Sequence, residues 1–376
     1  MKTRILIFCM LILCMGMLTG CWDYRSMDEI NIVSGIAVDL KEDDQYVLTL
    51  ELVNTSGMKD DGGAQSLVVT AEGETMFEAV RNAKKKLYNK LYLGSMRVLI
   101  VSQELAEKEG IQDVIDTFLR DMEPRETTFI VVSQEESAGK LMSASGLDTT
   151  NISYKIAKVI LEDHKVDSAT KSVQLFEAYN ILKATGVELV LPAIHMVQNG
   201  DEEVAEINGL AVFRGDKLTG FLSAEDTRYF LMATQGDTRG ALSLPHPEKE
   251  GKQIGLEIMQ LTSKPEVRYA NGNAAITVAV TMAYKTVEYS SRERISGQAL
   301  ETLNGEAERM VAERMHQVFE KIQKNLGVDI YGFGHKLYER QYSVWLGIED
   351  AWAQLFQNAE FDVQVKMKAI DIGLTS

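Results

Sequence analysis

Apolar and polar residues alternate in several short segments in the first part of the chain. Between Tyr46 and Val53 the leucines recur at every second position, which predicts a strand with one buried face. Residues 111–122 instead place apolar side chains three and four apart, which predicts a helix that Pro124 ends. Further strands are expected at 32–38, 66–71, 96–101 and 127–132, with a helix from Thr75 to Leu87. This order predicts a mixed α/β domain to about residue 140.

A small, mainly helical unit is expected next. Ser143–Gly146 interrupts the pattern, and apolar side chains then recur at helical spacing between residues 150 and 185. Gly186 is expected to end the second helix, and residues 187–197 return to a strand pattern. These features predict a middle domain at 141–200.

The last part of the chain has strand patterns followed by helices. Strands are expected at 208–213, 218–222 and 254–261, with a loop at 234–255. Asn271-Gly272 predicts a hairpin turn, and the returning strand alternates from Ile276 to Tyr284. A long helix is expected between the cap residues Ser296 and Gly327, followed by a shorter helix at 345–356 and a strand at 361–367. Strands followed by long helices favour an α+β domain at 201–376 over a doubly wound sheet.

The first twenty residues have the pattern of an export signal. Lys2 and Arg4 precede the uncharged stretch Ile5–Leu18, which is too short to cross a bilayer but suits a signal peptide. Leu18-Thr19-Gly20-Cys21 then has the form of a bacterial lipobox, so Cys21 is the candidate lipid-attachment residue. The other two cysteines lie in the leader, so the mature chain would contain no disulfide. The predicted fold class is therefore α+β, with three mixed α/β domains at 21–140, 141–200 and 201–376 after a cleaved signal peptide at 1–20.

The charge of the chain limits its partners. The formal net charge is −16, and it is −18 without Lys2 and Arg4. Such an acidic protein is not expected to bind nucleic acid, and anionic lipid head groups should repel it. Acyl chains on Cys21, rather than a basic patch, are therefore expected to hold it at a membrane. Lys84-Lys85-Lys86 is interpreted as the exposed face of a helix, with a phosphate or partner contact as the alternative.

The residues provide no motif for catalysis, for a cofactor or for a metal. Asp60-Asp61 and Asp201-Glu202-Glu203 lack the alternating oxygen spacing of a calcium loop. Gly332-Phe333-Gly334 lacks the third glycine of a dinucleotide-binding motif and follows a helix, so we expect a turn between two helices. A serine nucleophile elbow and a Walker loop are both absent. The histidines are too scattered for a zinc site: His164, His195, His246, His316 and His335.

Four segments together resemble one known family. The lipobox continues as Cys21-Trp22-Asp23-Tyr24-Arg25, and Ile32–Asp39 then reads Ile-Val-Ser-Gly-Ile-Ala-Val-Asp. Phe118–Arg125 reads Phe-Leu-Arg-Asp-Met-Glu-Pro-Arg, and Gly332-Phe333-Gly334 comes near the end. This combination resembles the Ger(x)C family, the C subunits of bacterial spore germinant receptors, over nearly the whole chain. The chain departs from the family in two places: Ser26-Met27 stands where a Glu is usual, and Ser343-Val344 rather than a Pro precedes Trp345.

The resemblance implies a non-enzymatic, three-domain lipoprotein on the outer face of the spore inner membrane, tethered through Cys21. It also implies two integral membrane partners, an A-type and a B-type subunit. One carries a cytosolic soluble domain and the other resembles an amino-acid transporter. The complex would sense nutrient germinants and start ion release.

Two other classes of protein are weighed against this one. A solute-binding lipoprotein would capture a nutrient directly, but it needs two doubly wound lobes around a cleft. The C-terminal hairpin and the long helix argue against that arrangement. An exported hydrolase would need a nucleophile–base pair, which the sequence does not provide.

Overall fold

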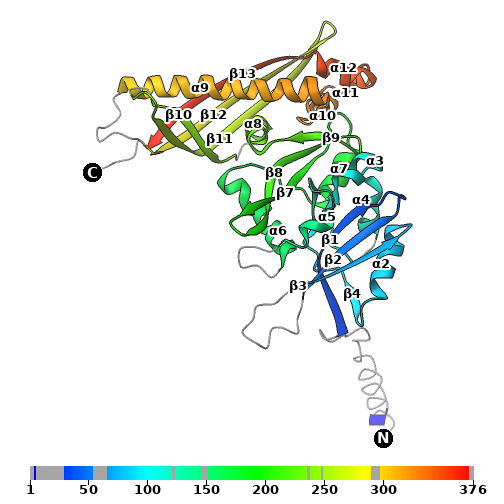
Figure 1. Cartoon of the computed structure of the whole chain (residues 1–376). Helices are drawn as coiled ribbons and strands as arrows, with labels where there is room; N and C mark the ends of the chain where they lie inside the picture. Colours follow the sequence, from blue (N-terminus) through cyan, green and yellow to red (C-terminus); the bar gives the residue numbers. More distant parts are fainter. Residues whose placement is uncertain are drawn as a thin grey trace.

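The structure is a computed structural model that describes residues 4–5, 29–53, 66–120, 123–144, 151–234, 238–246, 249–288 and 297–371, without the side chains at 164, 165 and 371. The described chain forms two β-sheets with helices packed against them, so the fold is mixed α/β. The two sheets lie at opposite ends of the molecule, and β1 enters the large sheet from the end farther from the small one (Figure 1).

The large sheet has nine strands in the order β3-β2-β1-β5-β6-β7-β8-β9, with β4 beside the start of β1. The block β1, β5, β6 and β7 is parallel, and antiparallel strands flank it on both sides. The strands are β1 (Ile30–Leu40), β2 (Tyr46–Val53), β3 (Ser66–Gly73), β4 (Lys90–Tyr92), β5 (Val98–Ser102), β6 (Phe129–Ser133), β7 (Val190–Asn199), β8 (Glu202–Arg214) and β9 (Lys217–Leu222).

Helices cover both faces of the parallel block, so this part of the molecule has three layers. Leu99 and Val101 of β5 point into one core, while Val98 and Ile100 point into the other. Strands buried on both faces have no solvent side, which explains their continuous apolar runs. One face carries α2 (Met76–Lys84), α3 (Gln103–Lys108), α4 (Gln112–Arg120) and α7 (Leu175–Lys183), and the other carries α5 (Ala138–Leu141) and α6 (Ile152–Val166).

A buried carboxylate in β2 holds the start of α6. Glu51 is fully buried and accepts the backbone N–H groups of Ile152 and Ser153, each at 2.8 Å. The first N–H groups of a helix lack partners within the helix, so an acceptor there stabilises it. A β-carbon on Gly35 of β1 would lie 2.1 Å from the Ser153 hydroxyl oxygen, so the helix can approach this closely only because position 35 is a glycine.

A second carboxylate, in β1, holds the start of α5. Asp39 accepts the backbone N–H of Ala138 at 2.6 Å and that of Gly139 at 3.0 Å, and the Ser137 hydroxyl donates to it at 2.9 Å. Burial raises the pKa of Asp39, and these hydrogen bonds oppose the rise. The segment Ile32–Asp39 thus positions both helices on one face of the sheet.

Among the described residues, helices cover the small sheet on one face only, and α9 (Gly297–Glu320) is the longest of them. Three of its strands are antiparallel, and β13 runs parallel to β12. The long helix α9 lies along the sheet (Figure 1). In β12 the residues from Ile276 to Tyr284 alternate between buried and solvent-facing positions, as their periodicity predicted. The strands, in sheet order, are β10 (Gly240–Pro245), β11 (Gln253–Ala270), β12 (Asn273–Glu288) and β13 (Glu360–Asp371).

Side chains of α9 also protect the edge strand β13. The Glu308 carboxylate accepts the backbone N–H of Met367 at 2.8 Å, and Nε2 of His316 lies 2.9 Å from the carbonyl oxygen of Phe361. These contacts occupy backbone groups that an edge strand would otherwise expose. The helix continues into a π-helical segment, η3 (Lys321–Leu326), and ends at Gly327, where φ is +66°.

The short helix α8 (Ala224–Thr234) joins the two sheets. Its residues Tyr229 to Ala233 are all buried, and one hydrophobic cluster contains them together with residues of β7–β9 and of the small sheet. The chain after η3 forms α10 (Phe333–Arg340), α11 (Tyr342–Trp345), η4 (Glu349–Ala351) and α12 (Trp352–Gln357) before β13. The two sheets therefore share a continuous core.

The structure departs from the expected elements at three points. A strand, β10, lies in the region 234–255 that was expected to be a loop, and β11 is one strand of eighteen residues where a shorter one was expected. The large sheet takes strands from all three predicted domains, so no sheet boundary falls at 140/141 or 200/201; that division stays a prediction. The expected cap Ser296 lies outside the described residues.

Candidate functional site

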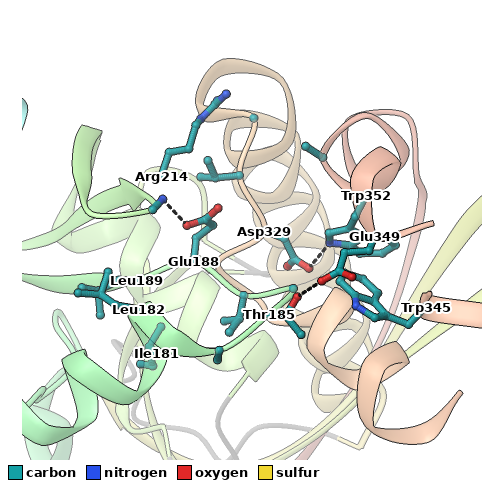
Figure 2. A pocket seen from close by; sticks show the side chains of 17 residues that line it. Ile181, Leu182, Thr185, Glu188, Leu189, Arg214, Asp329, Trp345, Glu349 and Trp352 are labelled. Carbon is teal, nitrogen blue, oxygen red and sulfur yellow. Dashed lines mark hydrogen bonds between the residues drawn. The ribbon is translucent and has the colours of Figure 1, made fainter. Parts of the chain in front are cut away.

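A cavity of about 310 Å³ lies where the large sheet meets the helices that follow α9. One wall comes from the segment after α7 and from the turn between β8 and β9. The other wall runs from Gly327 to α12, and Figure 2 shows Trp345 and Trp352 on this side, facing Thr185 and Glu188 on the other. Cavities between units are common binding sites, so this is the candidate site of the molecule.

Asp329 organises the turn that forms the second wall. Its buried carboxylate accepts the backbone N–H groups of Gly332 at 2.9 Å and Gly334 at 2.8 Å, and the indole N–H of Trp352 at 3.0 Å. Burial raises the pKa of Asp329 to about 6, while these donors oppose the rise. One buried side chain therefore holds Gly332-Phe333-Gly334 against α12.

Gly186 brings the first wall into contact with that turn. Its φ is +71°, and a β-carbon there would lie 2.5 Å from the carbonyl carbon of Gly334 and 2.6 Å from the nitrogen of His335. The N–H of His335 donates to the carbonyl of Gly186 at 2.7 Å, and the N–H of Glu188 donates to the carbonyl of Asp329 at 3.0 Å. Two backbone segments distant in sequence meet here at a distance that excludes any larger residue.

Three carboxylates of the described chain line the cavity, and each accepts a hydrogen bond. Glu188 accepts the N–H of Gly215 at 2.7 Å, and Glu349 accepts the Thr185 hydroxyl at 2.8 Å. Burial raises the pKa of Glu188 as it does that of Asp329. Because these hydrogen bonds cross from one segment of the junction to another, the polar groups serve to hold the segments together.

The chemistry available at the junction is therefore limited. Arg214 donates to the carbonyl of Leu326 at 2.9 Å, which ties the β8–β9 turn to the end of η3. Within the described residues, no group of three or more His, Cys, Asp or Glu side chains could hold a metal ion. The arrangement is suited to fixing the relation between the two sheets.

The predicted site residues do not gather at this junction. Cys21 and Asp60-Asp61 lie outside the described residues, so lipid attachment at Cys21 stays a prediction. Asp201-Glu202-Glu203 is exposed at the turn between β7 and β8. Lys84-Lys85-Lys86 is exposed at the end of α2, as expected.

The histidines serve different local roles. His195 lies 3.3 Å from the Glu206 carboxylate in the β7–β8 hairpin, and His316 contacts the edge of β13. His335 places Nδ1 3.0 Å from the carbonyl oxygen of Thr185 at the junction. His246 is buried, and the side chain of His164 is not described.

Sequence reasoning missed Asp329 and Glu188, and it predicted Gly186 only as a helix end. The available signal was Gly332-Phe333-Gly334, which the resemblance singled out and which begins three positions after Asp329. An Asp just before a glycine-rich turn commonly bonds to the backbone ahead of it. No spacing rule links that turn to Gly186, because their contact exists only in the folded chain.

Two family models match the chain in succession. The model described as "Spore germination protein N-terminal domain" matches residues 23–196, and "Spore germination B3/ GerAC like, C-terminal" matches residues 208–373. The chain belongs to this spore germination protein family. The C-terminal match contains the turn that Asp329 holds, and the N-terminal match contains Gly186. The cavity thus lies between the two parts that the family models describe.

Relatives in this germination family match over their full length. Spore germination protein KC of Bacillus subtilis (strain 168) is 25% identical over 94% of this chain and 91% of its own. Spore germination protein B3 of the same organism is 23% identical over 99% of this chain and 98% of its own. A crystal structure of the GerBC protein matches with a TM-score of 0.57 at 18% identity, covering 89% of this chain and 97% of that one, which shows a shared fold.

The resemblance to spore germinant receptor C subunits is confirmed by these matches. The family is non-catalytic, which agrees with the prediction that this chain is not an enzyme. Among the helices that the structure describes, none is both long enough and apolar enough to cross a bilayer.

Proposed function

We propose that this protein is the lipid-anchored C subunit of a spore germinant receptor, held on the outer face of the spore inner membrane through Cys21. The observation that carries the proposal is the order of features along the chain. A complete lipobox ends at Cys21, and the family match begins at residue 23. The proposed lipid-attachment residue therefore lies two positions before the start of the family match.

The geometry of the large sheet supports this role. Cys21 precedes Ile30, the first residue of β1, by nine positions, and an extended chain of that length spans about 30 Å at most. β1 enters the sheet at the end farther from the small sheet (Figure 1). In the proposed orientation the large sheet lies near the membrane and the small sheet points away from it.

Replacing the lipid-bearing cysteine tests the anchor. The Cys21→Ala protein should not receive diacylglycerol, and we expect it to be absent from the lipoprotein fraction of washed membranes and to impair germination. Cys14→Ala is the matched control, because it removes a thiol from the apolar stretch and leaves the lipobox intact. Mass spectrometry of the mature N-terminus should show a lipid-modified Cys21. An unmodified residue there would overturn the proposal.

The A-type and B-type membrane subunits are the proposed partners, and the subunit would act without a cofactor or bound metal. Purification in mild detergent should recover them together with this chain. Recovery of the lipidated protein alone, under conditions that keep the two membrane subunits together, would contradict this assignment. A solute-binding lipoprotein is less well supported, because among the described residues helices cover the small sheet on one face only, which does not make a doubly wound lobe.

A further inference from the structure

The segment between Glu78 and Glu104 carries a charge opposite to that of the rest of the protein. Residues 79–103 contain six lysines and arginines and no acidic residue, in a chain whose formal net charge is −16. Removing those six positive charges leaves −22 on the remaining residues. The average charge of the chain therefore conceals a strongly basic region.

The fold places part of this region where the chain enters the large sheet. Lys84 is the last residue of α2, and Lys90 begins β4 and pairs with Ile30 at the start of β1. Lys84-Lys85-Lys86 is exposed, and Tyr88 is fully exposed at 106%. We call Lys84, Lys85, Lys86, Tyr88 and Lys90 the basic patch; its strand β4 lies at the end of the molecule opposite to the small sheet (Figure 1).

Contacts within the protein leave most of this positive charge uncompensated. Lys85 donates to the Asn82 amide oxygen at 2.8 Å, and Lys86 donates to the carbonyl oxygen of Thr70 at 2.6 Å. Among the residues that the structure describes, Lys84-Lys85-Lys86 forms no ion pair, whereas Lys90 lies 3.4 Å from a Glu123 oxygen. A helix C-terminus favours nearby cations, which accounts for Lys84 and Lys85. It does not account for a fully exposed tyrosine and a further lysine beyond the helix.

We propose that the basic patch rests on the anionic surface of the bilayer beside the lipid anchor and so sets the orientation of the protein. The inference rests on the proposed lipidation of Cys21, which keeps Ile30 and its neighbour Lys90 within about 30 Å of the membrane. Each lysine near an anionic surface favours contact about fivefold, and tyrosine prefers the membrane–water interface. Charges are screened beyond about 8 Å at physiological salt, so the groups near the patch, rather than the net charge of the whole chain, govern this contact. Within the patch, only Lys90 forms an ion pair with a described acidic residue, Glu123.

The test measures how fast a water-soluble amine reagent modifies individual lysines, read by mass spectrometry. Full-length lipidated protein is placed in vesicles of 30% phosphatidylglycerol in phosphatidylcholine, and separately in vesicles of phosphatidylcholine alone. We expect Lys84, Lys85, Lys86 and Lys90 to react at least about tenfold more slowly on the anionic vesicles, and 1 M NaCl to remove the difference. Lys366 and Lys368, exposed on β13, should react equally on both.

Two variants with the same net charge sharpen the test. In Lys84→Gln/Lys85→Gln/Lys86→Gln, the protection of Lys90 should be lost. In the control Lys264→Gln/Lys366→Gln/Lys368→Gln, which changes the small sheet, Lys90 should stay protected.

The contrary result is that the lysines react at equal rates on both kinds of vesicle while the protein still floats with the vesicles. That result would overturn the proposed membrane contact of the basic patch and leave the proposed anchor intact. Protection that appears only when other membrane proteins are present would also overturn that contact. Failure to float, with Cys21 unmodified, would instead refute the proposed function.

Discussion

The two sheets of this protein bury their strands in different ways. The large sheet has a parallel centre covered by helices on both faces, so adjacent residues such as Leu99 and Ile100 enter separate cores. The small sheet has α9 on one face and solvent on the other, so only alternate residues of β12 are buried. In the large sheet, therefore, only the strand ends and the sheet edges remain for contacts with a partner. In the small sheet, one whole face is exposed to solvent.

The largest effect should come from breaking the cores of the two sheets. Leu99→Ala and Ile100→Ala should each lower the free energy of unfolding by about 3 kcal/mol, because both side chains are fully buried. In β12, Val278→Ala should cost about 2 kcal/mol, and its exposed neighbour Thr277→Ala less than about 1 kcal/mol. Denaturant titration checks all four. A near-neutral result for Leu99→Ala or for Ile100→Ala would mean that one face of the large sheet is not packed.

The contact between the segment after α7 and the start of α10 can be tested at Gly186. Gly186→Ala should cost about 3 kcal/mol, because the new β-carbon meets the backbone of Gly334 and His335 and the backbone has a positive φ. Gly251→Ala is the matched control: its φ is +74°, but nothing lies within 4 Å of the added carbon, so only about 1 kcal/mol should be lost. Equal losses in thermal unfolding would show that the close approach of the two segments does not matter.

Acidity should affect the junction through Asp329. Its folded-state pKa of about 6 lies above the ordinary value of 3.8, so the folded protein binds this proton more tightly than the unfolded chain does. The stability linked to Asp329 is therefore present below about pH 4 and is lost as the pH rises through 6, a change of about 3 kcal/mol.

The control for that prediction is Asp329→Asn, which does not titrate. Unfolding titrations at pH 4.5, 5.5 and 7 should show the stability of the native protein falling, relative to the variant, as the pH rises. A constant difference between the two proteins over this range would show that Asp329 stays ionised in the folded state.

The smallest effect concerns the protected edge of the small sheet. Glu308→Ala removes the acceptor for the Met367 N–H and should cost about 1 kcal/mol. Glu313→Ala, also on α9, removes only an exposed ion pair with Arg309 and should change stability by less than about 0.5 kcal/mol. Hydrogen exchange at Met367 should accelerate in the first variant alone; unchanged exchange there would show that α9 does not protect this edge.

The sequence predicted the two sheets with different success. β12 and β13 followed from strict alternation, since each has one solvent face. The parallel strands also appeared as apolar runs, but such runs do not reveal which strands pair. The large sheet therefore could not be seen to continue through β7, β8 and β9. β10 was missed because it has only six residues, ends in Pro245 and lies between polar stretches.

The proposed membrane-facing region and the junction at the cavity also differ in how far the sequence revealed them. Cys21 and the lysine run were visible, since each depends on neighbouring residues. The net charge of −16 led us to expect that anionic lipid would repel the whole protein. A net charge does not show where the charges lie, so it did not reveal the basic patch. Asp329 and Gly186 became meaningful only when folding brought their segments together.

The shared burial of α8 has a mechanical consequence. The second half of α8 is buried in one cluster with residues of both sheets, and the Gly186 contact joins the same two parts at a second place. The two sheets should then move as one rigid body about the proposed lipid anchor. A change of tilt at the large sheet would displace the small sheet as well.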